Sequence, residues 1–77
     1  MKQIAALEQH RNRLKGLAYR MTGSASEAED IVQDAFMQWL RTAPQDVANL
    51  EAWLVTVTSR KCLDYLKRKN ARNTFNY

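Results

Sequence analysis

Acidic side chains that could act as acids, bases or metal ligands are concentrated in one stretch of the chain. Asp30 and Asp34 are four residues apart, so on a helix their carboxylates would lie on one face. Paired carboxylates can carry out acid–base or metal chemistry. A metal site in a helical bundle needs further ligands from facing helices, and no histidine or second acidic segment supplies them. We therefore interpret the pair as part of a solvated helix face, and expect no enzyme, metal site or cofactor.

The cysteine and histidine content leads to the same interpretation. Cys62 and His10 are each the only residue of their type, which excludes an internal disulfide and a Cys/His zinc site. The 77 residues show no glycine-rich phosphate loop, no signal peptide and no apolar run long enough to cross a membrane. A chain of this length forms one domain with a modest core. We expect a cytoplasmic binding module with no membrane partner.

Charge is sorted along the chain, although the net charge is +4. Residues 1–20 carry a net charge of +4, residues 21–50 carry −4 and residues 51–77 carry +4. Such sorting indicates the kind of partner rather than the fold. The alternative is that the charges only cover solvated helix faces, and the charge pattern alone does not decide between the two.

Hydrophobic spacing predicts a small all-α three-helix bundle within residues 1–70. Helices are expected at about residues 3–21, 25–42 and 50–70, with residues 71–77 as a flexible tail. The third segment also resembles a strand, because Val55-Thr56-Val57-Thr58 alternates, but no other segment could pair with it. The second has the clearest apolar stripe, with steps of three and four through Ala28, Ile31, Val32, Ala35, Phe36, Trp39 and Leu40.

The ends of the predicted helices carry typical capping residues. Gly23 suits a left-handed C-terminal cap. Ser24 and Ser26 are each followed by a glutamate three residues later, so either can form a capping box for the second helix. Asn49 can cap the third helix. Gly16 lies inside the first helix, where glycine costs about 1 kcal/mol relative to alanine, and close packing against a neighbouring helix would explain it.

Two helix faces have the composition of partner surfaces. On the second helix, acids, a glutamine and an exposed methionine suit a protein interface. On the third, basic residues that follow a tryptophan suit nucleic acid, because they neutralise phosphates while the ring stacks on an unpaired base. The plainer alternatives are a wet helix face, and a core tryptophan with a basic helix end. The residues are Asp30, Gln33, Asp34, Met37 and Arg41 on the second helix, and Trp53, Thr56, Arg60, Lys61, Lys67 and Arg68 on the third.

Three blocks of sequence match patterns of a known family. Residues 29–36 (EDIVQDAF) resemble the signature AED-[LIV]-V-Q-[DE]-x-F, and residues 53–54 and 64–68 (WL and DYLKR) resemble the helix WL…D-x-L-[RK]-R. Residues 17–23 (LAYRMTG) resemble LAYRMLGS of one subgroup. The family is that of the bacterial RNA polymerase sigma factors of the extracytoplasmic-function (ECF) group, which belong to the sigma-70 family. The resemblance covers about residues 10–70, the domain called region 2.

This resemblance implies a transcription initiation factor domain. It implies that the second helix binds the β′ clamp helices of core RNA polymerase, and that the third helix and the loop at about residues 42–49 recognise and help melt the promoter −10 element. The loop would receive a base flipped out of the non-template strand. An anti-sigma factor is a further expected partner. The polymerase-binding residues would be Asp30, Gln33, Asp34, Met37, Leu40 and Arg41, and the DNA-binding residues Asn49, Trp53, Thr56, Arg60, Lys61, Lys67 and Arg68.

The chain also departs from the family pattern. Val55 stands where many members have an aromatic residue, and Arg60 where they have an asparagine. Arginine cannot reproduce the paired donor and acceptor of an asparagine amide, so the family's base preference is not carried over. The family's region 4, a helix-turn-helix domain that reads the −35 element, is absent from these residues, which leaves a fragment or a stand-alone region 2 protein.

Two alternatives stay open at this point. A basic helical adaptor that binds an acidic partner protein or an anionic surface is the second candidate function. The basic residues of the first helix, Arg11, Arg13, Lys15 and Arg20, either contact DNA or pair with the neighbouring acidic helix.

Overall fold

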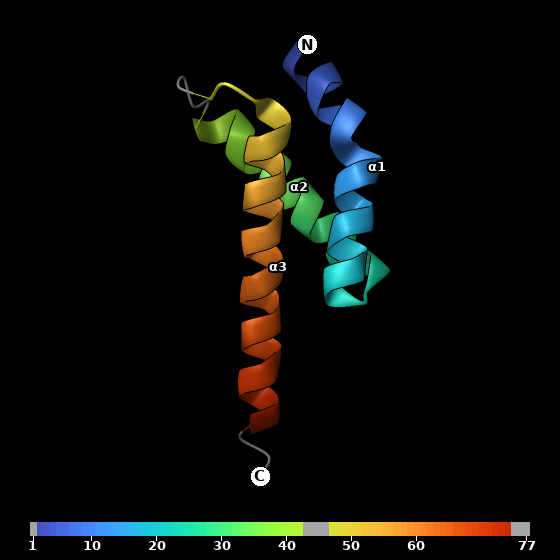
Figure 1. The fold of residues 1–77 in the computed structure, drawn as a ribbon, viewed down its shortest axis with the longest axis vertical. Helices are drawn as coiled ribbons and strands as arrows, with labels where there is room; N and C mark the ends of the chain where they lie inside the picture. Colours follow the sequence, from blue (N-terminus) through green and yellow to red (C-terminus); the bar gives the residue numbers. More distant parts are fainter. Residues whose placement is uncertain (1, 43–46, 75–77) are drawn as a thin grey trace.

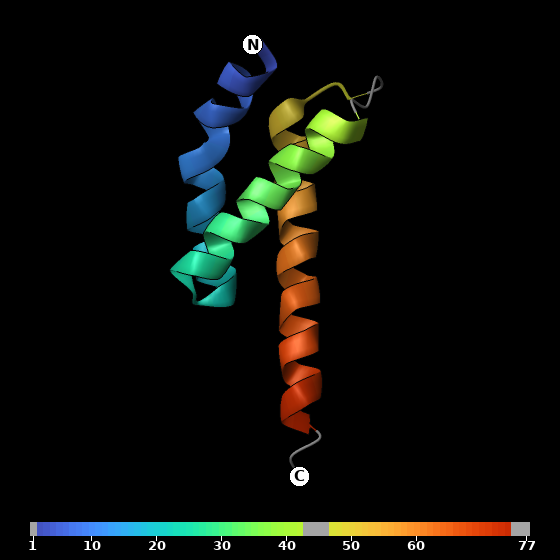
Figure 2. The same cartoon turned by 180° about the vertical axis from the view of Figure 1, so that it is seen from behind.

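The computed structural model describes residues 2–42 and 47–74. They form three helices, α1 (Lys2–Thr22), α2 (Ala25–Thr42) and α3 (Leu50–Thr74). Helix α2 runs diagonally across the other two, and each helix packs against both of its neighbours (Figures 1 and 2). The C-terminal part of α3 extends well beyond α1 and α2, which gives the molecule an elongated shape of 49 × 22 × 17 Å. The described residues contain no strand, which confirms the predicted all-α class.

The turn between α1 and α2 has the predicted capping chemistry. Gly23 has a φ of 72°, and its N–H donates a 2.8 Å hydrogen bond to the carbonyl oxygen of Tyr19. This bond is the left-handed glycine cap, which satisfies a carbonyl at the end of α1. Ser24 Oγ accepts a 3.2 Å hydrogen bond from the N–H of Glu27, so Ser24 is the N-cap of α2. Ser26 lies inside the helix, and the first of the two predicted caps is therefore the one used.

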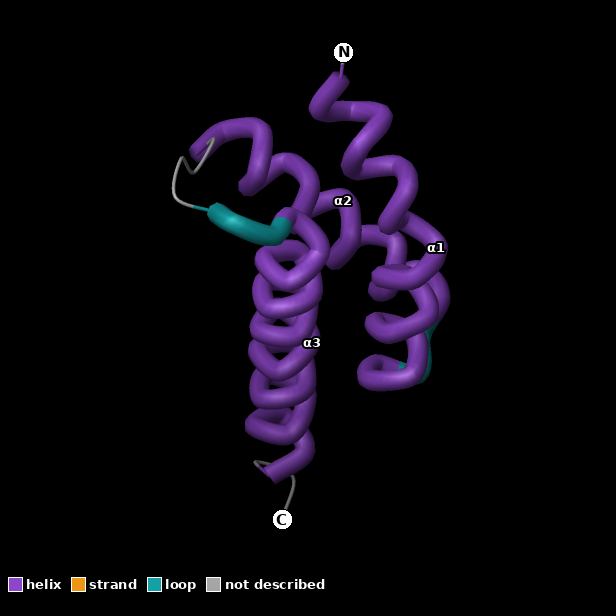
Figure 3. The backbone as a smooth tube through the Cα atoms, turned by 45° about the horizontal axis from the view of Figure 1, so that its top comes forward, coloured by secondary structure: helices purple, strands orange, loops and turns teal. Residues whose placement is uncertain are grey.

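Helix α3 begins after its predicted cap and is helical through residues 55–58, the segment that also resembled a strand. The side-chain oxygen of Asn49 accepts a 3.0 Å hydrogen bond from the N–H of Ala52, which confirms the predicted cap. Figure 3 shows the short loop that leads into this helix. Residues 55–58 are helical, so burial on a helix face overrides their β propensity. The helix continues to Thr74, four residues beyond its predicted end, and no proline or glycine occurs in residues 71–74 to stop it.

The core lies between the three helices, and each of them contributes buried side chains. Its largest fully buried hydrophobic side chains are Leu14 of α1, Val32 of α2 and Leu54 of α3. Ile4, an apolar residue near the start of α1, is 52% exposed and lies outside this core. The buried hydrophobic residues are Leu7, Leu14, Ala18, Ala28, Ile31, Val32, Ala35, Phe36, Leu54, Val57 and Cys62.

The predicted apolar stripe of α2 is buried only as far as Phe36. Trp39 is half-buried and Leu40 is 40% exposed. Because α2 crosses the bundle diagonally, its C-terminal end has the start of α3 beside it but has moved away from α1 (Figure 2). The spacing of apolar residues indicated the correct face of the helix, but it could not indicate how far α1 stays beside it.

Gly16 does not serve close packing. A Cβ atom placed on Gly16 would have no heavy atom within 4 Å outside the helix's own backbone, so the predicted packing role of this glycine is wrong. Its carbonyl oxygen accepts a 3.3 Å hydrogen bond from Nε of Arg20, which an alanine could accept equally well.

The basic residues of α1 form contacts within the bundle. Lys15 forms a 3.0 Å ion pair with Glu29 of α2, as one of the two alternatives predicted. Arg13 instead forms an ion pair with Glu51, at the start of α3. Arg11 bridges to Glu8 in its own helix. The guanidinium of Arg11 also lies 4.9 Å from the centre of the Phe36 ring, so it covers one edge of the core.

Candidate functional site

A pocket of about 360 Å³ lies where the loop before α3 meets the first turns of that helix. Trp53, Thr56 and Arg60 contribute to it because steps of three and four place them on one helix face. Asn49 joins them from the cap position. The structure therefore brings together four of the seven residues predicted to bind DNA. The complete lining is Val47, Ala48, Asn49, Ala52, Trp53, Thr56, Val57 and Arg60.

Trp53 is held in place by a second tryptophan. Its ring centroid lies 5.1 Å from that of Trp39 of α2, with an interplanar angle of 69°, which is an edge-to-face contact. Both rings are half-buried and pack against the core. Trp53 is thus neither a core residue nor a free surface side chain. Its contact with Trp39 orients a partly exposed aromatic ring at the pocket.

Polar groups of the pocket differ in what they can offer a ligand. The Oδ1 atom of Asn49 is used by the helix cap, so the side-chain NH₂ group is its available donor. Arg60 is exposed, and no ion pair to its guanidinium is found among the residues that the structure describes. A guanidinium without a carboxylate partner can bind a phosphate through two parallel hydrogen bonds.

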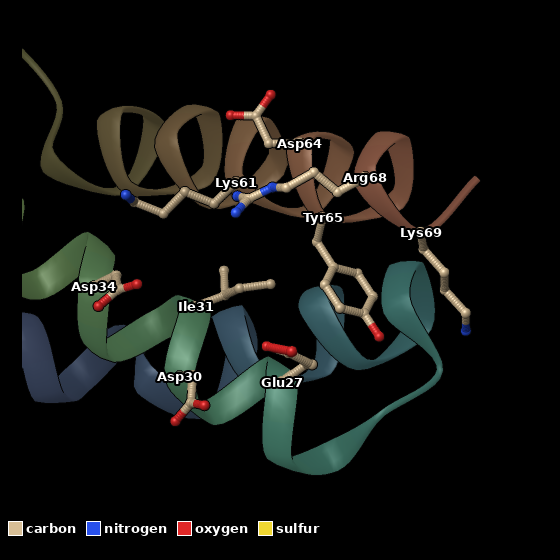
Figure 4. Close-up of a pocket in the computed structure, with 9 residues that line it drawn as sticks. All are labelled: Glu27, Asp30, Ile31, Asp34, Lys61, Asp64, Tyr65, Arg68 and Lys69. Carbon is tan, nitrogen blue, oxygen red and sulfur yellow. The ribbon is translucent and has the colours of Figure 1, made fainter. Parts of the chain in front are cut away.

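A second, larger hollow separates α2 from the C-terminal half of α3. This groove has a volume of about 600 Å³, and its two walls carry opposite charges. Figure 4 shows Tyr65 pointing from α3 toward α2, whereas Asp64 points the other way. The lining consists of Glu27, Asp30, Ile31 and Asp34 from α2, and of Lys61, Asp64, Tyr65, Arg68 and Lys69 from α3.

This groove divides the residues that the sequence had grouped as DNA-binding. Lys61 and Arg68 line it opposite Asp30 and Asp34, so they do not share the pocket of Trp53 and Arg60. Lys67, which lines neither hollow, is exposed on α3. Residues 43–46 of the predicted base-receiving loop lie outside the described residues.

The residues predicted to bind polymerase share one exposed face of α2. Met37 and Leu40 are 44% and 40% exposed, which is high for large hydrophobic side chains. Asp30 and Asp34 lie at the edge of this face, where it turns into the groove. All six residues are exposed, namely Asp30, Gln33, Asp34, Met37, Leu40 and Arg41.

Sequence reasoning assigned no role of their own to several residues near these sites. Val47 and Ala48 were included only as part of the loop at about residues 42–49, and the structure shows that they line the pocket. Leu63 is 50% exposed on α3. Its position three residues after Arg60 and four before Lys67 was a signal that the sequence did contain.

The resolved pKa shifts fall outside both hollows. Hydrogen bonds from Arg11 lower the pKa of Glu8, and the same contact raises the pKa of Arg11. Burial raises the pKa of the Cys62 thiol. In the part of the chain that the structure describes, no group of three or more His, Cys, Asp or Glu residues could hold a metal ion. None of the described helices is both long enough and apolar enough to span a membrane.

Comparison with known proteins assigns the family. The model of the family Sigma-70 region 2 matches residues 6–72. The chain is 46% identical over 68 residues to the "Probable ECF RNA polymerase sigma factor SigI" of Mycobacterium tuberculosis, a match that covers 88% of this chain and 23% of that protein. It is 44% identical over 66 residues to the "ECF RNA polymerase sigma factor SigJ" of the same organism, covering 84% and 20%. With the "ECF RNA polymerase sigma factor SigE" of Mycolicibacterium smegmatis it shares 33% identity over 64 residues, covering 82% and 25%.

The matches cover most of this chain but a small part of its relatives. The chain spans a quarter or less of the length of these curated proteins. No solved structure gives a significant match. The family match and the relatives agree with the motifs at residues 29–36 and 53–68, and the chain belongs to the Sigma-70 region 2 family, as a region 2 domain of the ECF type.

Proposed function

We propose that this chain is the part of a transcription initiation factor that joins core RNA polymerase to the promoter −10 element. The exposed face of α2 binds the β′ clamp helices, and the pocket at the start of α3 takes an unpaired base of the non-template strand. The observation that carries this proposal is the pocket itself. It places an aromatic ring, an amide donor and an exposed guanidinium around one small hollow.

The pocket has the groups that trapping an unpaired base requires. Unstacking a base from duplex DNA costs a few kcal/mol, so the protein must offer comparable interactions in return. Stacking of a base on an aromatic side chain contributes about 1–3 kcal/mol. The half-buried ring of Trp53 provides the stacking surface, and Arg60 provides the charge for a neighbouring phosphate.

The face of α2 is suited to a protein partner rather than to DNA. Asp30 and Asp34 would repel phosphates, but they attract a basic protein surface and orient its approach. Met37 and Leu40 add exposed apolar area beside them, and methionine adapts its shape to a partner. These properties support the assignment of Asp30, Gln33, Asp34, Met37, Leu40 and Arg41 to polymerase binding.

The DNA contacts are distributed unequally over the basic residues of α3. Lys61 and Arg68 face the carboxylates of α2 across the groove, which weakens their attraction for phosphates. We therefore assign the stronger phosphate contacts to Arg60 and Lys67. In a salt titration with single-stranded DNA, Arg60→Ala should reduce the salt dependence of binding more than Lys61→Ala does.

Polymerase binding is tested by single substitutions on α2. Gln33→Ala should weaken binding to core RNA polymerase, measured by pull-down or by titration against the β′ clamp helices. Gln9→Ala on α1 is a matched control, because it removes the same exposed side chain from another helix. Unchanged affinity in both Gln33→Ala and Asp34→Ala, with the fold intact, would contradict the assignment of this face.

The second candidate function is an adaptor that binds an acidic protein or an anionic surface. The exposed basic residues at the end of α3, Lys67, Arg68 and Lys69, favour it. Binding to a single-stranded oligonucleotide is compared with binding to vesicles of anionic lipid at the same salt concentration. A preference for unpaired bases supports the promoter function, whereas equal binding to any polyanion supports the adaptor.

A further inference from the structure

An exposed leucine interrupts the basic surface of α3. Leu63 is 50% exposed, and it is the only large hydrophobic residue exposed on α3 among the residues that the structure describes. The neighbouring Cys62 is completely buried, so the helix is oriented such that Leu63 faces solvent while the adjacent position faces the core. Leu63 contributes nothing to the hydrophobic core of the bundle.

The position of Leu63 connects it to the pocket. Thr56, Arg60, Leu63 and Lys67 follow one another at steps of four, three and four, so they form a continuous stripe along one face of α3. All four are exposed, and the first two line the pocket. At the helical rise of 1.5 Å per residue, Arg60 and Lys67 are about 10 Å apart along the helix, with Leu63 between them.

The charges around Leu63 indicate the kind of molecule that covers it. Two cations on the same stripe, Arg60 and Lys67, flank the leucine. Asp64, the nearest acid in the sequence, points away from α2 (Figure 4), and the two cations of the stripe outnumber it. A ligand that fits here carries negative charges on both sides of an apolar surface. A single nucleic acid strand has this arrangement, because its phosphates alternate with bases that have apolar faces.

We infer that the DNA strand continues from the pocket along α3, and that Leu63 packs against a second unpaired base. Arg60 and Lys67 bind two phosphates of the strand, with that base between them. A span of about 10 Å corresponds to about three nucleotides of a stacked strand, and to fewer of an extended one. This inference rests on the proposed function, since it extends the path of the strand that the pocket binds.

The test uses two single strands of nine nucleotides, oligothymidylate and a fully abasic strand with the same phosphates, measured by fluorescence anisotropy at low salt. Leu63→Ala should weaken binding to oligothymidylate about fivefold, the loss expected for part of a buried leucine side chain, and leave binding to the abasic strand unchanged. Lys67→Ala should weaken binding to both strands. It should also lower the salt slope by about 0.7, whereas Leu63→Ala leaves the slope unchanged.

Ile4→Ala is the matched control, because Ile4 is exposed to a similar degree, 52%, on α1. It should bind both strands as the unmodified chain does. Thermal denaturation checks that each variant is folded. Because the substituted positions are exposed, we expect little change in stability.

Two results overturn the inference. One is unchanged binding of oligothymidylate by Leu63→Ala, and the other is an equal loss for both strands, since the leucine then does not act through a base. Failure of the proposed function gives a different pattern. In that case the unmodified chain binds the abasic strand as tightly as oligothymidylate, or binds anionic vesicles more tightly than either.

Discussion

The two glycines of this chain should respond to the same substitution with opposite signs. Gly16 lies inside α1 with helical backbone, and a Cβ atom there would contact nothing within 4 Å. Alanine is favoured over glycine inside a helix by about 1 kcal/mol, partly because it restricts the unfolded chain. Since no clash offsets this gain, Gly16→Ala should raise the free energy of unfolding by about 1 kcal/mol.

Gly23 has equally open surroundings, so the two substitutions differ in the backbone conformation of the glycine and not in steric contacts. A Cβ atom at Gly23 would also meet nothing within 4 Å, but its φ is +72°. A residue with a side chain costs about 1–2 kcal/mol in this left-handed conformation. Gly23→Ala should therefore lower the free energy of unfolding by about that amount, although it removes no contact.

Both variants are measured by urea and thermal denaturation, followed by far-UV circular dichroism. For a domain of this size, 1 kcal/mol corresponds to a change in Tm of about 4–8 °C. We expect Tm to rise for Gly16→Ala and to fall for Gly23→Ala. The slope of the free energy of unfolding against urea concentration should be the same in both variants. A loss of stability in Gly16→Ala would refute the reasoning, because it would mean that another part of the chain packs against Gly16.

Four further predictions concern the core and the titrating groups. Thr58 is fully buried and its hydroxyl has no hydrogen-bond partner among the described residues, so Thr58→Val should stabilise the fold by about 1–3 kcal/mol, measured by urea denaturation; destabilisation would indicate a partner for the hydroxyl. Leu14 is 0% exposed, and Leu14→Ala should lower the free energy of unfolding by about 3–5 kcal/mol in the same assay. Cys62 is buried with a raised pKa, so iodoacetamide should react slowly with the folded chain and quickly in urea; equal rates would contradict its burial. The pKa of Glu8 is lowered by hydrogen bonds from Arg11, so this contact stabilises the fold above the unfolded pKa of Glu8 and is lost as pH falls through the folded pKa. Glu8→Gln should therefore reduce the loss of stability on acidification, and an unchanged pH profile would show that the contact is not formed in solution.

The three helices, the cap between α1 and α2 and the N-cap of α3 follow from the amino-acid sequence alone, whereas the end of α3 does not. Caps depend on residues within one turn of each other, so Gly23 and Asn49 can be identified from residue type and spacing. The apolar stripe of α2 indicates its buried face because side chains three and four residues apart share one side of a helix. The family, too, is recognisable from local motifs, and the comparisons confirm it.

Part of the candidate site was also predictable from spacing. The intervals between Trp53, Thr56 and Arg60 predict that they share one helix face, and these residues line one pocket. Spacing could not reveal that Trp39 supports Trp53, because this contact joins two helices. It also could not show that Gly16 faces open space, since that depends on where the neighbouring helices run.

The division of the basic residues of α3 between two surfaces depends on tertiary packing. Along the sequence Arg60 and Lys61 are neighbours with the same charge, and both were expected to bind DNA. In the folded chain Arg60 lines the pocket, whereas Lys61 lines the groove opposite the carboxylates of Asp30 and Asp34. Successive helical residues point about 100° apart, so the side on which α2 packs determines which cation faces an acid and which faces solvent. Hydrophobic periodicity fixes each helix face locally, but the electrostatic surroundings of a side chain come from the helix packed beside it.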